Sequence, residues 1–168
     1  MLSQVDPEHK IGPEWSLRNG VYRDFEFGMI WKKPRGFWQL TTGTAAQEFG
    51  EDARIIALEK RLNLSMQVDI TPVAESTLYQ HHRTAMQAFF ENQVSVKQTE
   101  LAGQPALASS EAFAEGRGKR LLITTIRDGH AFQVWFWGPP ETMANPEGEV
   151  VNALRGFAFP GSKLRISD

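Results

Sequence analysis

The stretch KRLLITTIRDGHAFQVWFWGPP, residues 119–140, predicts a β-hairpin. Asp128 and Gly129 stand between two runs rich in β-branched and aromatic residues, which is among the strongest short-range hairpin signals. Side chains alternate along a strand, so each arm presents apolar residues on both of its faces. A sheet with one face in water would carry polar residues at every second position. We therefore expect this hairpin to be central, with helices or loops covering both of its sides.

Further strands are predicted on both sides of this hairpin along the chain, wherever apolar residues alternate with polar ones. The expected strands are residues 20–31 (alternating from Phe25 onward), 37–42, 53–61, 64–71 and a hairpin of 94–101 with 106–115. Residues 53–61 also contain good helix formers, so a helix over 50–62 stays an alternative. Because residues 64–71 alternate regularly as a strand, we favour a strand for residues 53–61 as well, since the two segments would pair. Residues 44–52 fit either a short helical turn or a loop.

Two helices are expected, over residues 74–92 and 146–155, and the first carries apolar residues at spacings of three and four. Residues 157–159 fit a short strand or a plug against the core. This order of elements predicts an α+β fold built on an antiparallel sheet. We expect one domain over residues 20–159, a lead-in at 1–19 that packs through Ile11, Trp15 and Leu17, and a tail at 160–168.

The composition of the 168 residues excludes several classes of function. A net charge of −2 gives no bulk attraction to nucleic acid, so no nucleic-acid partner is expected. The absence of cysteine excludes disulfides, thiolate metal sites and a cysteine nucleophile. No apolar run approaches the roughly 18 to 20 residues of a membrane span. The first residues lack a basic-then-apolar signal pattern, which favours the cytoplasm.

No motif in the sequence predicts catalysis, a metal site or a cofactor. His81 and His82 are adjacent, whereas metal-binding helices space their histidines four residues apart, so His82 is expected to be a hydrogen-bonded core residue. A triad of Ser109 or Ser110 with His130 and Asp128 has no supporting nucleophile motif. No phosphate-binding glycine loop precedes a helix. We therefore expect a protein that is not an enzyme and has no cofactor.

The candidate binding residues are aromatic and basic. Tryptophans are frequent interface anchors, and exposed apolar patches often mark partner sites. Alternatively, the tryptophans fill space between sheet and helix; Trp137, just before Pro139 and Pro140, is our candidate for an exposed patch. Basic residues cluster at 32–35 and at 117–120; if the two clusters converge they bind an acidic partner or a phosphate, and otherwise they remain solvated. The candidate partner-binding residues are Trp31, Lys33, Arg35, Trp38, Trp135 and Trp137.

Four stretches together resemble the Mog1/PsbP-like domains, and they span roughly residues 20–159. The first is Phe25-Glu26-Phe27 followed by Pro34-Arg35-Gly36-Phe37-Trp38, similar to the opening aromatic strand and Pro-x-Gly, Trp entry of the family. The second is the Gly103-Gln104-Pro105-Ala106 turn, and the third is the hairpin at 126–135. The last is the segment 149–159, which ends Gly156-Phe157-Ala158-Phe159 with glycine where the family usually has serine.

The resemblance implies a three-layer α/β/α sandwich around a mainly antiparallel sheet. It also implies a non-enzymatic role, since family members act as accessory or binding proteins, some for a small GTPase and some for a photosynthetic complex. No functional residue is carried over, because the family has no shared catalytic set. We therefore expect a protein-binding or scaffold module of a larger bacterial assembly, whose partner is another protein. The alternative is a carrier for a small apolar ligand or lipid, with an aromatic pocket between sheet and helix.

Overall fold

The computed structural model describes residues 10–11, 15–73, 77–144 and 148–160. Two antiparallel sheets make up most of this part of the chain, and short helices cover parts of them. The predicted α+β class with mainly antiparallel strands is therefore confirmed, although the chain forms two sheets where one was expected. No helix among the described residues is long and apolar enough to cross a membrane.

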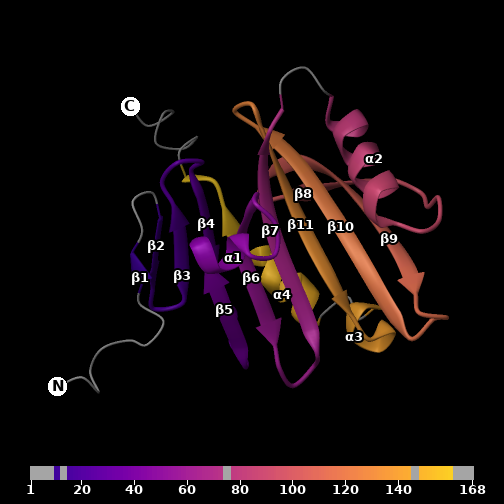
Figure 1. The fold of residues 1–168 in the computed structure, drawn as a ribbon, viewed down its shortest axis with the longest axis horizontal. Coiled ribbons are helices and arrows are strands. Elements are labelled where there is room, and N and C mark those ends of the chain that lie inside the picture. Colours follow the sequence, from indigo (N-terminus) through magenta and orange to yellow (C-terminus); the bar gives the residue numbers. More distant parts are fainter. Residues whose placement is uncertain (1–9, 12–14, 74–76, 145–147, 161–168) are drawn as a thin grey trace.

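The larger sheet has seven strands, and each neighbouring pair runs antiparallel (Figure 1). In spatial order the strands are β5 (Trp38–Thr42), β6 (Ala53–Glu59), β7 (Leu64–Pro72), β11 (His130–Gly138), β10 (Gly118–Arg127), β9 (Gln104–Phe113) and β8 (Lys97–Leu101). Asp128 and Gly129 join β10 to β11 with φ values of 51° and 77°, as a type I′ turn requires. The predicted central hairpin and the strand at 53–61 are both confirmed.

Alternation along β11 divides the apolar residues between the two faces of this sheet. Phe132, Val134 and Phe136 are buried in the main core on one face. Burying side chains of this size stabilises the fold by roughly 1.5–3 kcal/mol each. Trp135 and its cross-strand neighbour Leu122 point to the other face, into a smaller core. Both faces of the central hairpin are thus covered, as the sequence pattern predicts.

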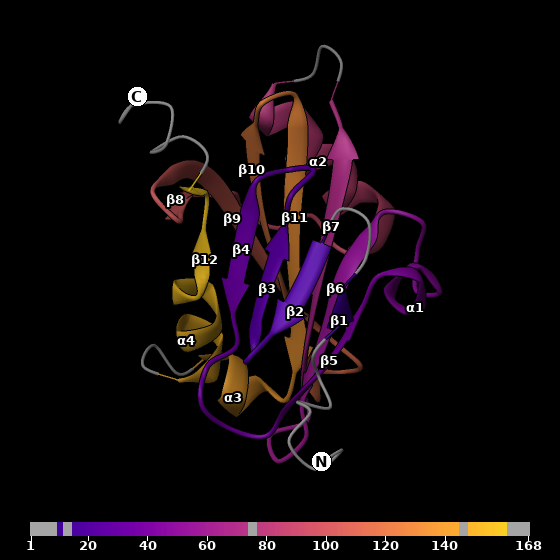
Figure 2. The same cartoon turned by 90° about the vertical axis from the view of Figure 1, so that its left-hand side faces the viewer.

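The helices lie on opposite faces of the larger sheet. Helix α2 (Leu78–Phe89) packs on β9 and β10, and it begins at a capping box in which Thr77 and Gln80 satisfy each other's backbone N–H groups. Helix α4 (Glu149–Arg155) contributes to the main core on the other face (Figure 2). The short α3 (Pro140–Ala144) follows β11, and α1 (Thr44–Gln47) follows β5. Residues 74–76 and 145–147 of the two predicted helices lie outside the described residues.

The smaller sheet lies beside β5 at one end of the molecule (Figure 1). Its strands, in spatial order, are β1 (Lys10–Ile11), β2 (Trp15–Arg18), β3 (Val21–Asp24), β4 (Met29–Lys32) and β12 (Phe157–Ala158). The lead-in expected at residues 1–19 therefore contributes β1 and β2, and Leu17 is buried in the main core. Residues 157–158 form the short strand that was one of two options for this segment.

The close approach of β12 to β4 explains a departure from the family pattern. The Lys32 backbone N–H donates to the Gly156 carbonyl oxygen at 2.9 Å. A Cβ atom at Gly156 would overlap the Lys32 carbonyl oxygen, so the serine usual in the resembling family does not fit here without a backbone shift. Glycine at this position therefore permits the contact between the two segments.

The prediction of one continuous strand over residues 20–31 is wrong, because a turn at 25–28 separates β3 from β4. The carboxylate of Asp24 accepts hydrogen bonds from the backbone N–H groups of Glu26 and Phe27 at 3.1 and 3.0 Å. Gly28 closes the turn with a φ of 70° and donates its N–H to the Asp24 carbonyl oxygen. Such Asx-type bonding competes with strand pairing and favours a turn.

Candidate functional site

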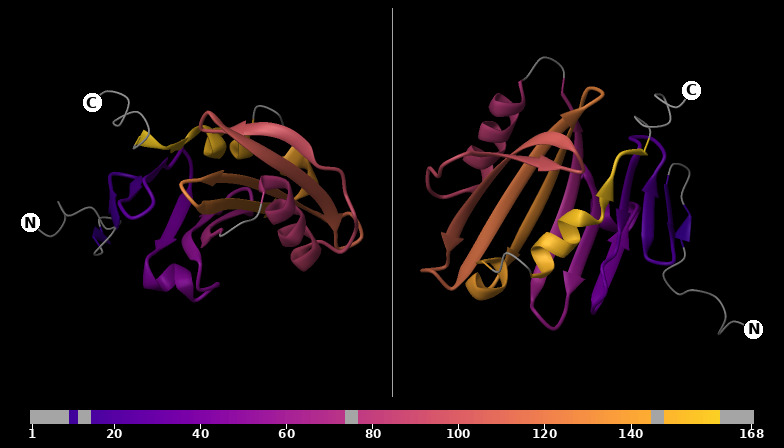
Figure 3. Two further views of the ribbon diagram at one scale, coloured as in Figure 1. Left: turned by 90° about the horizontal axis from the view of Figure 1, so that it is seen from above. Right: turned by 180° about the vertical axis from the view of Figure 1, so that it is seen from behind.

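Helices α1 and α2 lie on the same side of the larger sheet (Figure 3). A groove opens on this side, lined by residues that follow α1 and by the last residue of α2. Its volume is about 520 Å³, and its floor is formed by side chains of β7, β10 and β11. The residues that line it are Phe49, Gly50, Glu51, Asp52, Gln67, Asp69, Phe89, Phe113, Arg120, Trp135 and Trp137. We call it the aromatic groove, because five of these residues are phenylalanine or tryptophan.

Strand register places the floor residues side by side. Trp135 of β11 lies opposite Gln67 of β7, and Trp137 lies opposite Ser65 in the same pairing. On the other side of β11, Trp137 lies opposite Arg120 of β10. Because side chains on one face repeat every second residue, these strands present both tryptophans to the same side of the sheet.

The walls of the aromatic groove come from segments far apart in the chain. Phe49 follows α1 and Phe89 ends α2, and their side chains are 61% and 59% exposed. The ring of Phe89 meets the ring of Trp135 edge to face, with centroids 4.9 Å apart. Trp135 is buried beneath it, while Trp137 is 36% exposed. The groove thus offers an anchored, partly open aromatic surface.

Carboxylates lie among these aromatic side chains. Asp69 on the floor accepts a hydrogen bond from the Gln67 amide at 2.8 Å. Burial raises the pKa of Asp69 above its usual value, the Gln67 hydrogen bond opposes the rise, and the nearby charge of Asp52 adds to it. The charged form of Asp69 is therefore less stable here than in water.

Arg120, the basic residue that lines the aromatic groove, is held by the buried carboxylate of Glu111. Arg120 donates to Glu111 Oε1 from Nε at 2.8 Å and from Nη2 at 2.6 Å. Burial alone would raise the pKa of Glu111, but the bonds from Arg120 and from the backbone N–H groups of Asn92 and Glu91 outweigh it and lower the pKa. The Arg120 guanidinium also lies over the Phe113 ring, 5.0 Å from its centroid. These contacts fix Arg120 in the groove wall.

The structure separates the six predicted binding residues into three places. Trp135 and Trp137 both line the aromatic groove. Trp31 and Trp38 are buried in the main core on the opposite face, where their rings meet with centroids 6.1 Å apart. Lys33 and Arg35 lie in the connection between β4 and β5, and neither lines the groove. The space-filling role that was the alternative for the tryptophans thus fits Trp31 and Trp38, and also Trp135, which is buried in the smaller core against α2.

The histidines do not assemble the triad considered from sequence. His82 belongs to α2 and is buried on the side that faces β9 and β10, with Nδ1 2.8 Å from the Thr124 hydroxyl and Nε2 2.9 Å from the Ser109 hydroxyl. The Ser109 hydroxyl donates to the Ser95 carbonyl oxygen, so His82 Nε2 must carry the proton that bonds Ser109. His130 instead packs on the ring of Phe27. The prediction that His82 is a hydrogen-bonded core residue is confirmed.

No cluster of three or more metal-ligating side chains occurs among the residues that the structure describes. The two basic clusters belong to different connections: Lys33 and Arg35 lie between β4 and β5, and Arg117 lies in the turn between β9 and β10. Arg117 donates to a carbonyl oxygen of its own turn, and Arg120 is held by Glu111.

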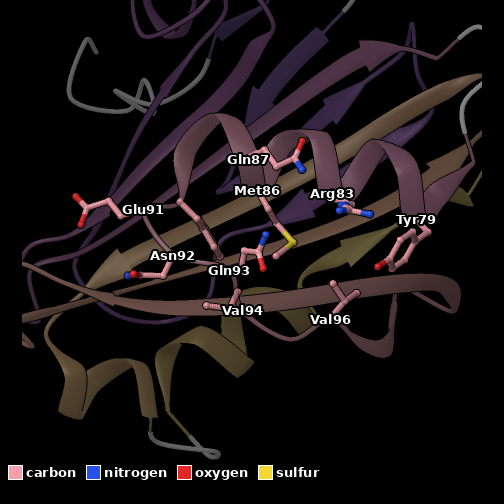
Figure 4. Close-up of a pocket in the computed structure, with 10 residues that line it drawn as sticks. Tyr79, Arg83, Met86, Gln87, Glu91, Asn92, Gln93, Val94 and Val96 are labelled. Carbon is pink, nitrogen blue, oxygen red and sulfur yellow. The ribbon is translucent and has the colours of Figure 1, made fainter.

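A second cavity of about 400 Å³ lies between α2 and the segment that follows it (Figure 4). Tyr79, Arg83 and Met86 reach it from α2, and Val94 and Val96 face them from the following segment. Its one exposed large apolar residue is Tyr79. The aromatic groove combines three such residues with charged groups and is therefore the stronger candidate site.

Sequence reasoning missed four important residues of the aromatic groove. Phe49 stands in a segment left open between helical turn and loop, and Phe89 was assigned to the apolar stripe of its helix. Phe113 ends β9, and Asp69 is one of the polar residues that alternate along β7. The signal that could have found Asp69 is its position on the same face as Trp135 once β7 and β11 are paired.

Comparison with solved structures identifies the fold. The chain is similar to cyanobacterial PsbP (CyanoP) from Synechocystis sp. PCC 6803, with a TM-score of 0.59 and 12% identity over 92% of this chain and 99% of that one. It is also similar to a protein of Bacteroides thetaiotaomicron VPI-5482, with a TM-score of 0.52 and 14% identity over 79% of this chain and 45% of that one. No protein-family model and no curated protein matches the sequence. The chain has a PsbP-like fold.

Proposed function

We propose that this chain is a non-enzymatic protein-binding module whose aromatic groove receives a segment of another polypeptide. The observation that carries the proposal is the convergence of exposed aromatic side chains. Of the six large apolar residues that are exposed in the described part of the chain, Phe49, Phe89 and Trp137 line this one groove. Exposed apolar patches on globular domains often mark partner sites, and tryptophan is a frequent anchor in them.

The proposal includes an accessory role in a larger assembly, which the resemblance to Mog1/PsbP-like domains supports. Helices α2 and α4 on opposite faces of the larger sheet also support the expected three-layer arrangement. In that arrangement the main core, with Trp31 and α4, lies on one side of the larger sheet. The aromatic groove lies on the opposite side, where side chains of β7 and β11 line it between the residues that follow α1 and the end of α2.

A carrier for a small apolar ligand is the second candidate function. The volume of the aromatic groove, about 520 Å³, lies within the range of roughly 300–1,000 Å³ that is typical of small-molecule sites. Such sites bury most of the ligand, whereas Phe49 and Phe89 are largely exposed here. An apolar ligand would also desolvate Asp69 without offering it a partner, which is costly. Both observations favour the polypeptide.

The test compares two aromatic residues that are equally exposed. Peptides selected from a random displayed library against the wild-type protein are synthesised, and their affinities are measured by isothermal titration calorimetry. We expect Phe89→Ala to weaken binding at least about tenfold, which corresponds to about 1.4 kcal/mol. Phe37→Ala removes a ring with the same exposed fraction of 59% outside the groove, and we expect unchanged affinity.

Trp137→Ala provides the second arm of this test. We expect the same loss of affinity, at least about tenfold, with a free energy of unfolding within about 1 kcal/mol of the wild-type value because the side chain is partly exposed. Native mass spectrometry of the purified wild-type protein tests the carrier. Suppose that an apolar molecule co-purifies with the wild-type protein but not with Trp137→Ala, and that no peptide binds in the groove. This result would reject the protein-binding module and support the carrier.

A further inference from the structure

The charges that line the aromatic groove are unbalanced. Glu51, Asp52 and Asp69 are the acidic residues of its lining, and Arg120 is the basic one. Arg120 already pairs with the buried carboxylate of Glu111. None of the three acidic side chains that line the groove forms an ion pair with any residue that the structure describes. The groove therefore carries a net negative charge that no described cation offsets.

Two of these carboxylates are held close together by the backbone. The Ile70 backbone N–H donates to the Asp52 carbonyl oxygen at 3.0 Å, and Asp69 lies opposite Ala53 where β6 pairs with β7. Asp52 is therefore the near neighbour of Asp69, and its charge adds to the rise in the pKa of Asp69. Two like charges beside a partly buried position are stabilised when a cation is placed between them.

The aromatic rings beside Asp69 supply the other half of a cation site. Trp135 lies opposite Gln67, two residues from Asp69 along β7, and it is buried beneath the exposed ring of Phe89. Trp137 is the next residue of β11 on the same face and is partly exposed. The face of an aromatic ring attracts an ammonium or guanidinium group, most strongly for tryptophan. The Arg120 guanidinium over Phe113 is an interaction of this type within the same groove. Carboxylates and aromatic rings together recognise a cation on an apolar stem.

We infer that the aromatic groove binds a basic segment of the partner polypeptide, with a lysine or arginine side chain lying along Phe89 and Trp137 and its charge beside Asp69 and Asp52. The inference rests on the proposed function and specifies the chemistry of the partner. A long basic side chain suits this geometry because its methylene stem packs on apolar surface while its charged end pairs with a carboxylate. The small net charge of the whole chain, −2, means that this preference is local to the groove.

The test uses three short synthetic peptides that differ only in charge: leucine alternating with lysine, with glutamine, or with glutamate. Binding is measured by calorimetry at low and at raised ionic strength. We expect the lysine peptide to bind at least about tenfold more tightly than the glutamine peptide, and this advantage to shrink as salt is added. We expect the glutamate peptide to bind most weakly of the three.

Asp69→Asn is the decisive variant, because an asparagine still accepts the hydrogen bond from Gln67 but carries no charge. We expect this variant to weaken binding of the lysine peptide at least about tenfold, so that its advantage over the glutamine peptide disappears. The affinity for the glutamine peptide should stay within about twofold of the wild-type value. Asp52→Asn should act in the same direction, and it keeps the test open if Asp69→Asn folds poorly. Glu100→Gln, on the exposed part of β8, is the control and should change neither affinity.

The outcomes separate this inference from the proposed function. Equal binding of the lysine and glutamine peptides, both lost in Trp137→Ala, would overturn the inference and leave the binding module in place. Tighter binding of the glutamate peptide would also overturn the inference. If no peptide binds in the groove and laurate does, with loss in Trp137→Ala, the proposed function fails as well.

Discussion

Replacement of Trp31 by alanine is expected to lower the free energy of unfolding by about 3–5 kcal/mol, the range for truncation of a large buried aromatic residue. The Trp31 side chain is fully buried, and its ring packs against Trp38 and Phe157 with centroids 6.1 Å away in each case. Its Nε1 donates to the Ala153 carbonyl oxygen at 2.9 Å, which ties β4 to α4. The substitution removes both the packing and this hydrogen bond.

The measurement is urea unfolding followed by far-ultraviolet circular dichroism, which does not depend on the tryptophan that is removed. Trp137→Ala is the comparison, since the same substitution there removes a side chain that is 36% exposed. We expect a loss several times smaller at Trp137 than at Trp31. Equal losses would contradict the assignment of Trp31 to the core and of Trp137 to the groove.

Acidification is expected to destabilise the fold through His82. Burial, with a further contribution from the neighbouring His81, lowers the pKa of His82 to about 4 from its usual 6.5. Between these pH values the unfolded chain binds a proton at His82 and the folded protein does not. The contribution of His82 to the free energy of unfolding is therefore fully present above about pH 6.5 and is lost as the pH falls towards 4. At about 1.4 kcal/mol per pKa unit, the loss at pH 4 is on the order of 3 kcal/mol.

The hydrogen bonds of His82 give the structural reason. Its unprotonated Nδ1 accepts from the Thr124 hydroxyl, so a second proton would reverse this bond, leave the hydroxyl proton without this acceptor and place a charge between α2 and the sheet. The check is the free energy of unfolding measured from pH 7 to pH 4. His82→Leu should be less stable at pH 7 and should lose most of this pH dependence, whereas His81→Gln should retain it. An unchanged pH slope in His82→Leu would show that other groups cause the loss.

The central part of the fold follows from local signals in the sequence. Asp128 and Gly129 specify the turn of the β10–β11 hairpin, and the alternation of residues 64–71 indicates β7 and, through it, the strand at 53–61. The apolar stripe of α2 is equally local, because its period is that of one helix. These elements depend on residues close together in the chain, and they are placed correctly.

The smaller sheet was missed because its turns were overlooked. Asn19 and Gly20 have φ values of 53° and 72° and join β2 to β3, so the same kind of turn signal was present there. Phe25, counted as the start of an alternating strand, lies in the turn after Asp24 and is largely exposed. Apolar alternation alone does not distinguish a strand from a turn that carries aromatic residues.

The aromatic groove could be predicted only in part. Trp137 was proposed as an exposed residue from its position at the end of the central hairpin, and it lines the groove. Phe49, Phe89 and Asp69 join it only because α1 and α2 end on either side of the β7–β11 pair. Such a meeting depends on tertiary packing, which no local pattern in the sequence encodes.

The pairing of β12 with β4 has a consequence for the synthesis of the chain on the ribosome. Strand β4 ends at Lys32, but its last partners come more than a hundred residues later in the chain. Strand β12 pairs with the edge of β4, the Ala153 carbonyl oxygen accepts the hydrogen bond from Trp31, and Phe157 packs on the Trp31 ring. The first hairpins therefore emerge long before their last partner strand, with Trp31 and the edge of β4 uncovered. Domain closure must wait for nearly the whole chain, and until then these apolar residues are available to chaperones.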